Sequence, residues 1–219
     1  MDRFLELLPD FWKAAGETLY MTTIALLMAG VLGTIIGVGL YVTRPGGLWP
    51  NRIVSGVISL LVNFFRPIPF VIFIAVLQPF TRLVIGTGIG INAGAFAIGI
   101  AASFAIGRIV EQHLVSVSPG VIEAARSMGA GPWRILFTVA IPEALGPLIL
   151  GYTFVVVALI DMTAMAGAVG GGGLGAFALV YGFRQFEPIV MWAAIVLIVV
   201  FVHLLQTFGT WLARRIMRR

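Results

Sequence analysis

The sequence contains no cysteine, one lysine and two histidines among its 219 residues. Without cysteine there is no disulfide framework and no thiolate metal site, and His113 and His203 cannot form a zinc centre without carboxylate partners. Because Lys13 is the single lysine, a phosphate-binding loop that ends in lysine is excluded. The chain alone therefore predicts no metal site and no nucleotide site.

Charge is also scarce, at 11% of residues, against roughly 25% in soluble domains. Hydrophobic residues make up 60% of the chain and the mean hydropathy is +1.06. A spanning helix needs about 20 apolar residues, so this composition predicts an all-α integral membrane protein. The net charge of +5 would suggest nucleic acid binding in a soluble chain, but here we expect the basic residues to follow membrane topology, with no nucleic acid partner.

Charge-free runs predict five transmembrane helices in a single domain, residues 1–219. Gly86, Gly88 and Gly90 predict a loop that delays the third helix until Ile91. Acidic residues near the N-terminus argue against a signal peptide, and no soluble domain is expected after the last span. The expected spans are 18–43, 53–80, 91–112, 144–166 and 188–212.

Arginine is distributed unevenly between the two sets of loops. Nine arginines follow the first and third spans or lie in the C-terminal tail, and four basic residues lie on the other side. Positive charge is retained on the cytoplasmic side, which predicts an N-terminus outside and a C-terminus in the cytoplasm. The two sets are Arg44, Arg52, Arg108, Arg126, Arg134, Arg214, Arg215, Arg218 and Arg219 against Arg3, Lys13, Arg82 and Arg184.

Common catalytic patterns are missing or out of context. Gly170, Gly172 and Gly175 match the dinucleotide fingerprint, but that pattern works as the turn of a strand–turn–helix unit. We interpret Gly170 to Gly175 as an irregular or re-entrant segment instead. Asp161 is the single aspartate within a span, and proteolysis by paired aspartates needs two. We therefore expect no catalytic residue.

The longest loop on the predicted cytoplasmic side has an ordered sequence. Ser118 and Pro119 are typical of a helix N-cap and first position, and Gly129 of a helix end. The pattern predicts a short helix over 121–128 and a second helix from Pro132. Small alanines in the first helix would allow a partner to dock closely, with polar contacts around them. An amphipathic loop lying on the membrane is the alternative.

These residues resemble a known family. Glu123-Ala124-Ala125, Gly129 and Val139-Ala140-Ile141-Pro142 are similar to the E-A-A, G, I-x-L-P signature of permease subunits of bacterial ABC importers. Other segments, including 66–70 and 164–175, resemble methionine-importer permeases, and the likeness covers nearly the whole chain.

The resemblance implies a type I ABC importer permease fold, in which the loop 113–142 carries a coupling helix that inserts into a cleft of the ATPase. It implies a homodimer on two ATPase subunits, fed by an extracytoplasmic substrate-binding lipoprotein, in the lipid of the inner or plasma membrane. ATP and Mg²⁺ would be bound by the ATPase, and no cofactor by this chain. The residues implied to couple to the ATPase are Glu123, Ala124, Ala125, Arg126, Gly129 and Pro142.

Two charges interrupt the apolar runs, Arg66 and Asp161. A charge within a span is costly, on the order of 2.5 to 3.5 kcal/mol, and usually faces a cavity or the bundle interior. The two could contact a zwitterionic substrate, or could pair and hold the fold or a gate closed. Candidate pathway or gate residues are Arg66, Pro69, Phe70, Asp161, Met162, Thr163 and Met165.

The predicted function is that of a permease for an ATP-driven importer of methionine or a related amino acid, working by alternating access. Asp161-Met162-Thr163 and Pro67 depart from the methionine-permease pattern, which leaves another amino acid or small zwitterion as an alternative substrate. An ion-coupled secondary carrier using Asp161 and His203 is a further alternative. It is disfavoured because such carriers often contain internal repeats, and these five spans show no evident duplication.

Overall fold

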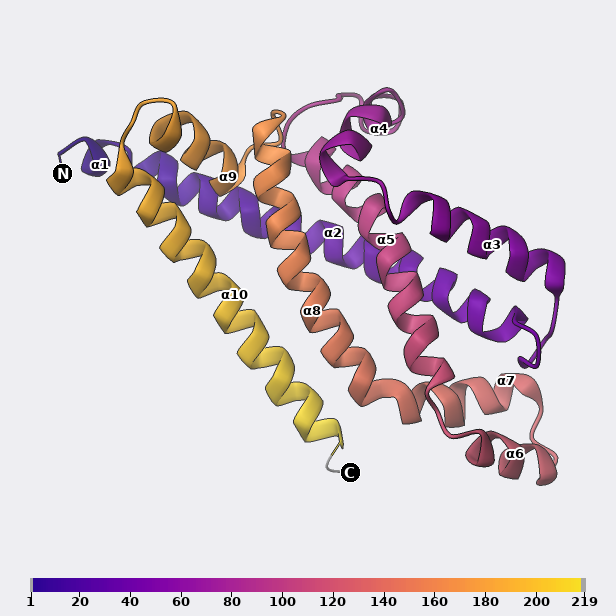
Figure 1. Ribbon diagram of the computed structural model, residues 1–219. Helices are drawn as coiled ribbons and strands as arrows, with labels where there is room; N and C mark the ends of the chain where they lie inside the picture. The colour runs from indigo at the N-terminus through magenta and orange to yellow at the C-terminus, as the bar shows by residue number, and fades with distance from the viewer. Residues whose placement is uncertain (1, 218–219) are drawn as a thin grey trace.

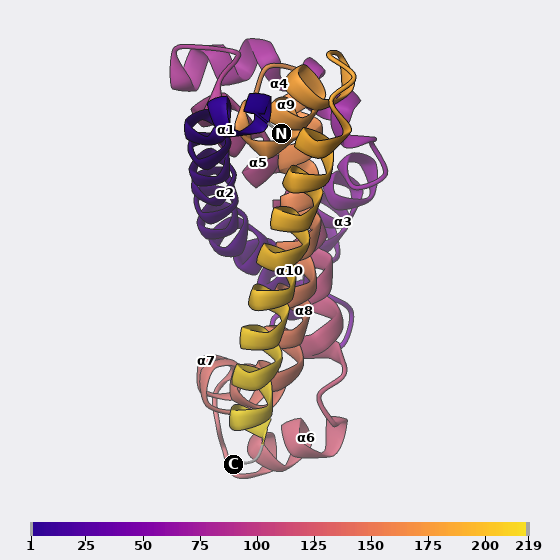
Figure 2. The ribbon, with the colours of Figure 1, turned by 90° about the vertical axis from the view of Figure 1, so that its left-hand side faces the viewer.

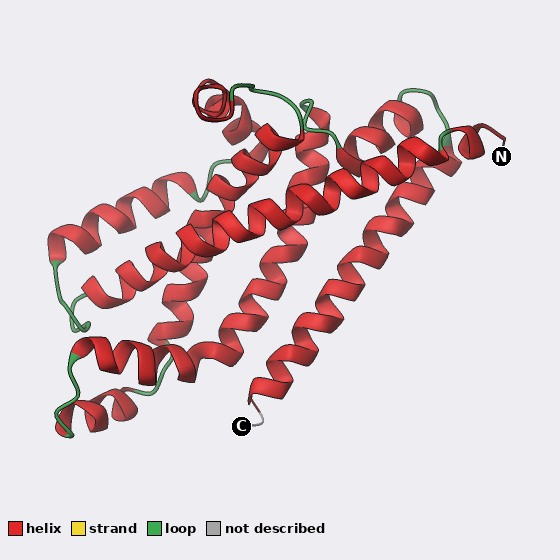
Figure 3. Cartoon of the chain, turned by 180° about the vertical axis from the view of Figure 1, so that it is seen from behind, coloured by secondary structure: helices red, strands yellow, loops and turns green. Residues whose placement is uncertain are grey.

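The computed structural model describes residues 2–217, and every regular element in that range is helical (Figures 1 and 3). Two segments have π-helical hydrogen bonding, Leu136–Ala140 and Ala178–Phe183. The α-helices are α1 (Asp2–Glu6), α2 (Leu8–Thr43), α3 (Arg52–Phe65), α4 (Phe70–Ile85), α5 (Ile91–Val115), α6 (Pro119–Ser127), α7 (Pro132–Ile135), α8 (Ile141–Ala168), α9 (Gly173–Phe177) and α10 (Pro188–Met217).

Four helical stretches are long and apolar enough to cross a membrane: α2, α5, the stretch from α7 through α8, and α10. The first and last extend beyond their predicted limits. Helix α2 begins at Leu8 and includes the charged residues that precede the apolar run, and α10 continues to Met217. Helix α5 begins at Ile91, as the glycines before it predict.

The span expected over 53–80 consists of two helices in the structure. Helices α3 and α4 meet at an angle of 114°, with the break between Phe65 and Phe70. Pro67 and Pro69 lie in the break, and neither can donate the backbone hydrogen bond that a continuous helix needs. Hydropathy runs through the break, so the apolar pattern alone does not reveal it. Helices α3 and α4 together give a fifth span if the bent pair is counted as one.

Contact between α2 and α5 forms the centre of the bundle, and α2 crosses α5 and α8 obliquely (Figures 1 and 3). Two glycines on α2 make this approach possible. A methyl group on Gly33 would lie 2.5 Å from Ile106 Cβ, and one on Gly37 would lie 2.5 Å from the Gly107 carbonyl oxygen. Small residues of this kind let spans associate closely where lipid offers no hydrophobic gradient.

The two ends of the bundle carry different elements (Figures 1 and 2). Helices α6 and α7 lie near the C-terminal end of α10, and we call this the α6 end. Helix α1, helix α9 and the loop before α5 lie at the opposite end, which we call the α9 end. Helix α1 and the last turn of α10 therefore lie at opposite ends of the bundle (Figures 1 and 2).

Candidate functional site

The loop at the α6 end folds as a helix, a glycine and a second helix. Helix α6 starts with Pro119 at its first position, and Ser118 occupies the N-cap position but makes no side-chain capping bond. Gly129 ends the helix with a φ of +78°, a conformation that costs an L side chain about 1–2 kcal/mol. The Ala130 amide donates to the Ala125 carbonyl oxygen at 3.1 Å, and α7 begins at Pro132. The predicted arrangement is confirmed.

The residues of the E-A-A signature divide between two faces of α6. Glu123, Ala124 and Arg126 are exposed, whereas Ala125 is 3% exposed and packs into the main core of the bundle. Pro142 is exposed in the first turn of α8. The helix thus packs on the bundle through Ala125 and the half-buried Ile122, and its exposed face carries the other alanine, a carboxylate and a guanidinium.

The turn between α2 and α3, residues 44–51, is attached to this loop. Arg126 Nη2 donates to the Gly47 carbonyl oxygen at 3.3 Å, and the ring centroids of Trp49 and Trp133 lie 4.6 Å apart. Arg44 lies over the Tyr41 ring with its Cζ 4.9 Å from the centroid. A cavity of about 130 Å³ between the turn and α6 is lined by Tyr41, Arg44, Glu123 and Arg126, among others.

Arg66 lies in the α3–α4 break. It is the C-cap of α3 and is exposed, and the residue before α4, Pro69, is exposed as well. Phe70, the first residue of α4, is 8% exposed and packs into the main core. The break therefore directs the guanidinium away from the bundle interior of the single chain.

Asp161 lies on an exposed face of α8, and no salt bridge joins it to Arg66 within the chain. Its sequence neighbours point elsewhere: Met162 is half-buried, and Thr163 is buried with its hydroxyl donating to the Ile160 carbonyl oxygen at 2.7 Å. Met165 shares the exposed face. The exposed residues of this face are Phe154, Ala158, Asp161, Met165 and Ala168, spaced alternately four and three apart as on one side of a helix.

An exposed carboxylate on a spanning helix has a physical consequence. Facing lipid costs Asp161 on the order of 2.5 to 3.5 kcal/mol, so such groups usually meet water or another protein surface. The face is free in the single chain. Geometry thus favours an Asp161 that lies at a water-filled path or a protein interface over one that pairs internally.

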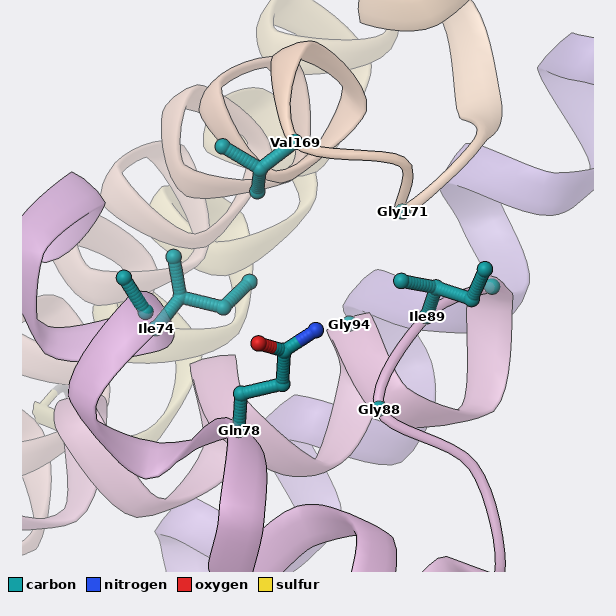
Figure 4. Close-up of a pocket in the computed structure, with 9 residues that line it drawn as sticks. Ile74, Gln78, Gly88, Ile89, Gly94, Val169 and Gly171 are labelled. Carbon is teal, nitrogen blue, oxygen red and sulfur yellow. The ribbon is translucent and has the colours of Figure 1, made fainter.

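A polar pocket at the α9 end is absent from the sequence predictions. A cavity of about 100 Å³ lies between α4, the loop before α5 and the segment after α8, and the Gln78 side chain extends into it from α4 (Figure 4). A larger adjoining cavity of about 600 Å³ shares Gln78 and is bordered by Arg82 and Thr87. The signal that could have found it is the amide of Gln78, which follows an apolar run of eight residues in α4.

The Gly170 to Gly175 segment is partly as predicted. Residues 169–172 form a turn, but Gly173 to Gly175 are the first residues of α9. The interpretation of the whole segment as irregular is therefore wrong for its second half. As for metals, no group of three or more His, Asp or Glu side chains gathers within residues 2–217.

The profile of the family described as "Binding-protein-dependent transport system inner membrane component" matches residues 29–218. The chain therefore belongs to this family of inner-membrane transport components, and it is a multi-pass transport subunit rather than an enzyme. Its fold is that of the permeases of type I ABC importers.

Curated relatives match over nearly the whole chain. The "Methionine import system permease protein MetP" of Bacillus subtilis is 45% identical over 212 residues, which cover 97% of this chain and 96% of the relative. The "Probable D-methionine transport system permease protein MetI" of Pasteurella multocida is 41% identical, covering 94% of this chain and 97% of the relative.

Solved structures are similar over the same length. A chain of "Inward facing conformations of the MetNI methionine ABC transporter: CY5 native crystal form" has a TM-score of 0.93 and 38% identity, with 99% of both chains covered. "Crystal structure of an amino acid ABC transporter with histidines" has a TM-score of 0.81 at 19% identity, covering 97% of both chains. The second likeness concerns the fold alone.

Proposed function

We propose that this chain is the permease subunit of an ATP-driven importer that carries methionine or a related amino acid across the cytoplasmic membrane. The observation that carries the proposal is the α6 loop: an exposed Glu123, Ala124 and Arg126 on a short helix at one end of a spanning bundle. Relatives of nearly equal length are named as methionine permeases, which supports the substrate class.

The proposed assembly contains two copies of this chain, two ATPase subunits and an extracytoplasmic substrate-binding lipoprotein. ATP and Mg²⁺ are bound and used by the ATPase. Glu123, Ala124, Arg126, Gly129 and Pro142 face or shape the docking surface, and Ala125 anchors α6 to the bundle. The arginines near the α6 end favour an orientation with this end in the cytoplasm and the N-terminus outside.

The pathway is proposed to run along the exposed face of α8. Asp161 and Met165 would line it, and Met162 and the buried Thr163 would support that face. Arg66, Pro69 and Phe70 would form a gate at the α3–α4 break, where irregular backbone is tolerated only beside protein or a water-filled cavity. Closure of the ATPase pair would move the coupling helices and rock the bundles between outward and inward openings.

An importer of another amino acid or small zwitterion on the same scaffold is the second candidate. The observation that favours it is the exposed Asp161 on the α8 face, one of the residues that depart from the methionine-permease pattern. A carboxylate in a pathway would attract an ammonium group whatever side chain the amino acid carries. Competition experiments separate the two candidates.

The test is uptake by the complete complex in liposomes with the binding protein. Labelled L-methionine is supplied with ATP or a nonhydrolysable analogue, and other amino acids are added in excess. We expect uptake with ATP only, competed by methionine and poorly by other amino acids. ATP hydrolysis without methionine uptake would reject the methionine assignment and keep the second candidate.

A further inference from the structure

The segment that joins α8 to α9 is rich in glycine but closely packed. Gly170, Gly172 and Gly173 have φ values of +89°, +83° and +78°, which glycine adopts without penalty. A methyl group on Gly167 would collide with the Ala176 backbone nitrogen, and one on Gly175 would collide with the Ala164 backbone. Residues 164–177 therefore form one tightly packed unit, which we call the α8–α9 hairpin.

Two side chains of α2 hold this hairpin. Glu17 Oε2 accepts a hydrogen bond from the Gly173 backbone N–H at 2.8 Å, and Thr18 Oγ1 accepts one from the Leu174 N–H at 2.8 Å. The first N–H groups of a helix have no partner within it, and a carboxylate there is electrostatically favourable. Thr18 is 2% exposed, so its bond is shielded from water. A helix start is thus capped by another helix, 156 residues away in sequence.

The opposite end of α2 is fastened to the coupling loop. The Asn51 N–H donates to the Thr43 carbonyl oxygen at 2.9 Å, which ties the turn 44–51 to the last residue of α2. The same turn contacts the loop through Arg126 and Gly47 and through the rings of Trp49 and Trp133. One helix is therefore attached to α6 and α7 at one end and to the α8–α9 hairpin at the other.

Helix α2 is suited to carry movement between these attachments. It has 36 residues without a break, a length of about 54 Å at 1.5 Å per residue. At the crossing it packs so closely on α5 that Gly33 and Gly37 have no space for a side chain. Helix α8 is thus connected to the coupling loop along its own chain through α7 and also through α2. It contacts α2 at the hairpin and through Tyr152, whose hydroxyl donates to the Gly30 carbonyl oxygen at 3.2 Å.

We propose that Glu17 and Thr18 are positioning residues for transport. Their two hydrogen bonds hold the α8–α9 hairpin against α2, so that movement of the coupling loop reaches the far end of the pathway through α2. The proposal rests on the proposed importer function. It predicts that losing the Glu17 and Thr18 bonds and losing the Trp49–Trp133 contact have non-additive effects, because movement of the coupling loop reaches the hairpin by this route only while both attachments are present.

The test compares matched variants of the complete complex in liposomes. Thr18→Val removes the acceptor at nearly constant volume, and Thr18→Ser keeps it. We expect methionine imported per ATP hydrolysed to fall roughly threefold to tenfold in Thr18→Val, the range of one hydrogen bond, and to stay within about twofold in Thr18→Ser. Equal ratios in Thr18→Val and the wild type would overturn the proposal.

A double-mutant cycle tests whether the two effects are non-additive. Trp49→Ala is combined with Thr18→Val, and the double variant is expected to lose no more than the worse single variant. A double variant whose loss is the product of the two single losses would mean independent sites and would also overturn the proposal. If Thr18→Val does not assemble, Glu17→Gln is substituted in the cycle, since it removes only the charge of the second acceptor.

A second readout does not depend on uptake. Because the chain has no cysteine, Ala168→Cys places a single thiol on the exposed end of α8. Its reaction rate with a membrane-impermeant reagent is expected to change when a nonhydrolysable ATP analogue is added, and the change is expected to be lost with Thr18→Val. A response that survives in Thr18→Val contradicts the proposal, whereas a wild type that imports no methionine contradicts the proposed function instead.

Discussion

Glycine serves different purposes at Gly129, at the α6 end, and at Gly167 and Gly175, at the α9 end. At the α6 end, Gly129 has no atom near the position of a missing Cβ, and its role is the positive φ that ends α6. At the α9 end, Gly167 and Gly175 lie in helices and do not have positive φ, but neighbouring backbone atoms leave no space for a side chain. The first glycine shapes a local turn, and the other two allow two helices to touch.

The difference follows from what each end contacts. The α6 end presents exposed polar residues on a short helix, as a surface for another protein requires. The α9 end is held by contacts between distant parts of the same chain, including the Glu17 and Thr18 bonds. The exposed surface of α6 is therefore formed by residues adjacent in the sequence, whereas the α9 end is closed by bonds between residues far apart in the sequence. Four substitutions test this contrast.

The largest effect is expected for Gly175→Leu. The new side chain would collide with the Ala164 backbone and force the α8–α9 hairpin apart, at a cost of about 3 kcal/mol, the upper end of the overpacking range. The measurement is thermal unfolding of the purified complex. Gly56→Leu on α3 is the matched control because nothing lies within 4 Å of its missing Cβ. Equal stability of the two variants would refute the packing role of Gly175.

Glu123→Lys should leave stability unchanged and abolish coupling. Reversal of an exposed charge on α6 does not disturb the core, but at a docking surface it removes the carboxylate and places the opposite charge against the groups of the partner that face Glu123. We expect normal membrane insertion with uptake and ATP hydrolysis no longer linked. Glu6→Lys, an exposed acid at the α9 end, is the control. Normal coupled uptake in Glu123→Lys would argue against α6 as the docking helix.

Asp161→Asn tests the exposed face of α8 between the two ends. Loss of the charge should lower uptake several-fold, roughly the effect of 1 kcal/mol, while the complex still assembles and its ATPase still responds to the binding protein. Asn is cheaper than Asp within a membrane, so a folding defect is not expected. Unchanged assembly together with unchanged transport would remove Asp161 from the pathway.

The smallest effect is expected for Gly129→Asn. Asn tolerates the left-handed conformation better than other L residues, so its cost is below the 1–2 kcal/mol of a typical side chain. Coupled uptake should fall less than with Gly129→Ala, measured side by side. The reverse order would mean that Gly129 contacts the partner directly instead of setting the turn.

Local signals predicted the parts of the structure that depend on adjacent residues. The glycines before Ile91 predict the start of α5, and the Pro119, Gly129 and Pro132 pattern predicts the two loop helices, with the bounds of α6 within two residues. Turns and caps are set by backbone chemistry at single positions. Around Arg66 the hydropathy predicts one span over 53–80, and the structure divides it into two helices at 114°, with Pro67 and Pro69 between them.

Contacts between distant residues could not be predicted in this way. Ala124 is exposed and Ala125 is buried, although both are alanines and adjacent in the sequence. Gln78 enters a pocket only because α4 turns toward the end of α8. Glu17 and Thr18 look like ordinary residues before an apolar run, and their partners lie 156 residues away.

The central claim is that this chain moves an amino acid only when a separate ATPase drives it through the α6 loop. It is tested most directly by L-methionine uptake into liposomes that contain this chain with or without the ATPase subunits, at fixed ATP and binding protein, with and without a proton gradient. The account predicts uptake only where the ATPase and ATP are both present, whatever the gradient. Gradient-driven uptake by the chain alone would contradict it and identify an ion-coupled carrier.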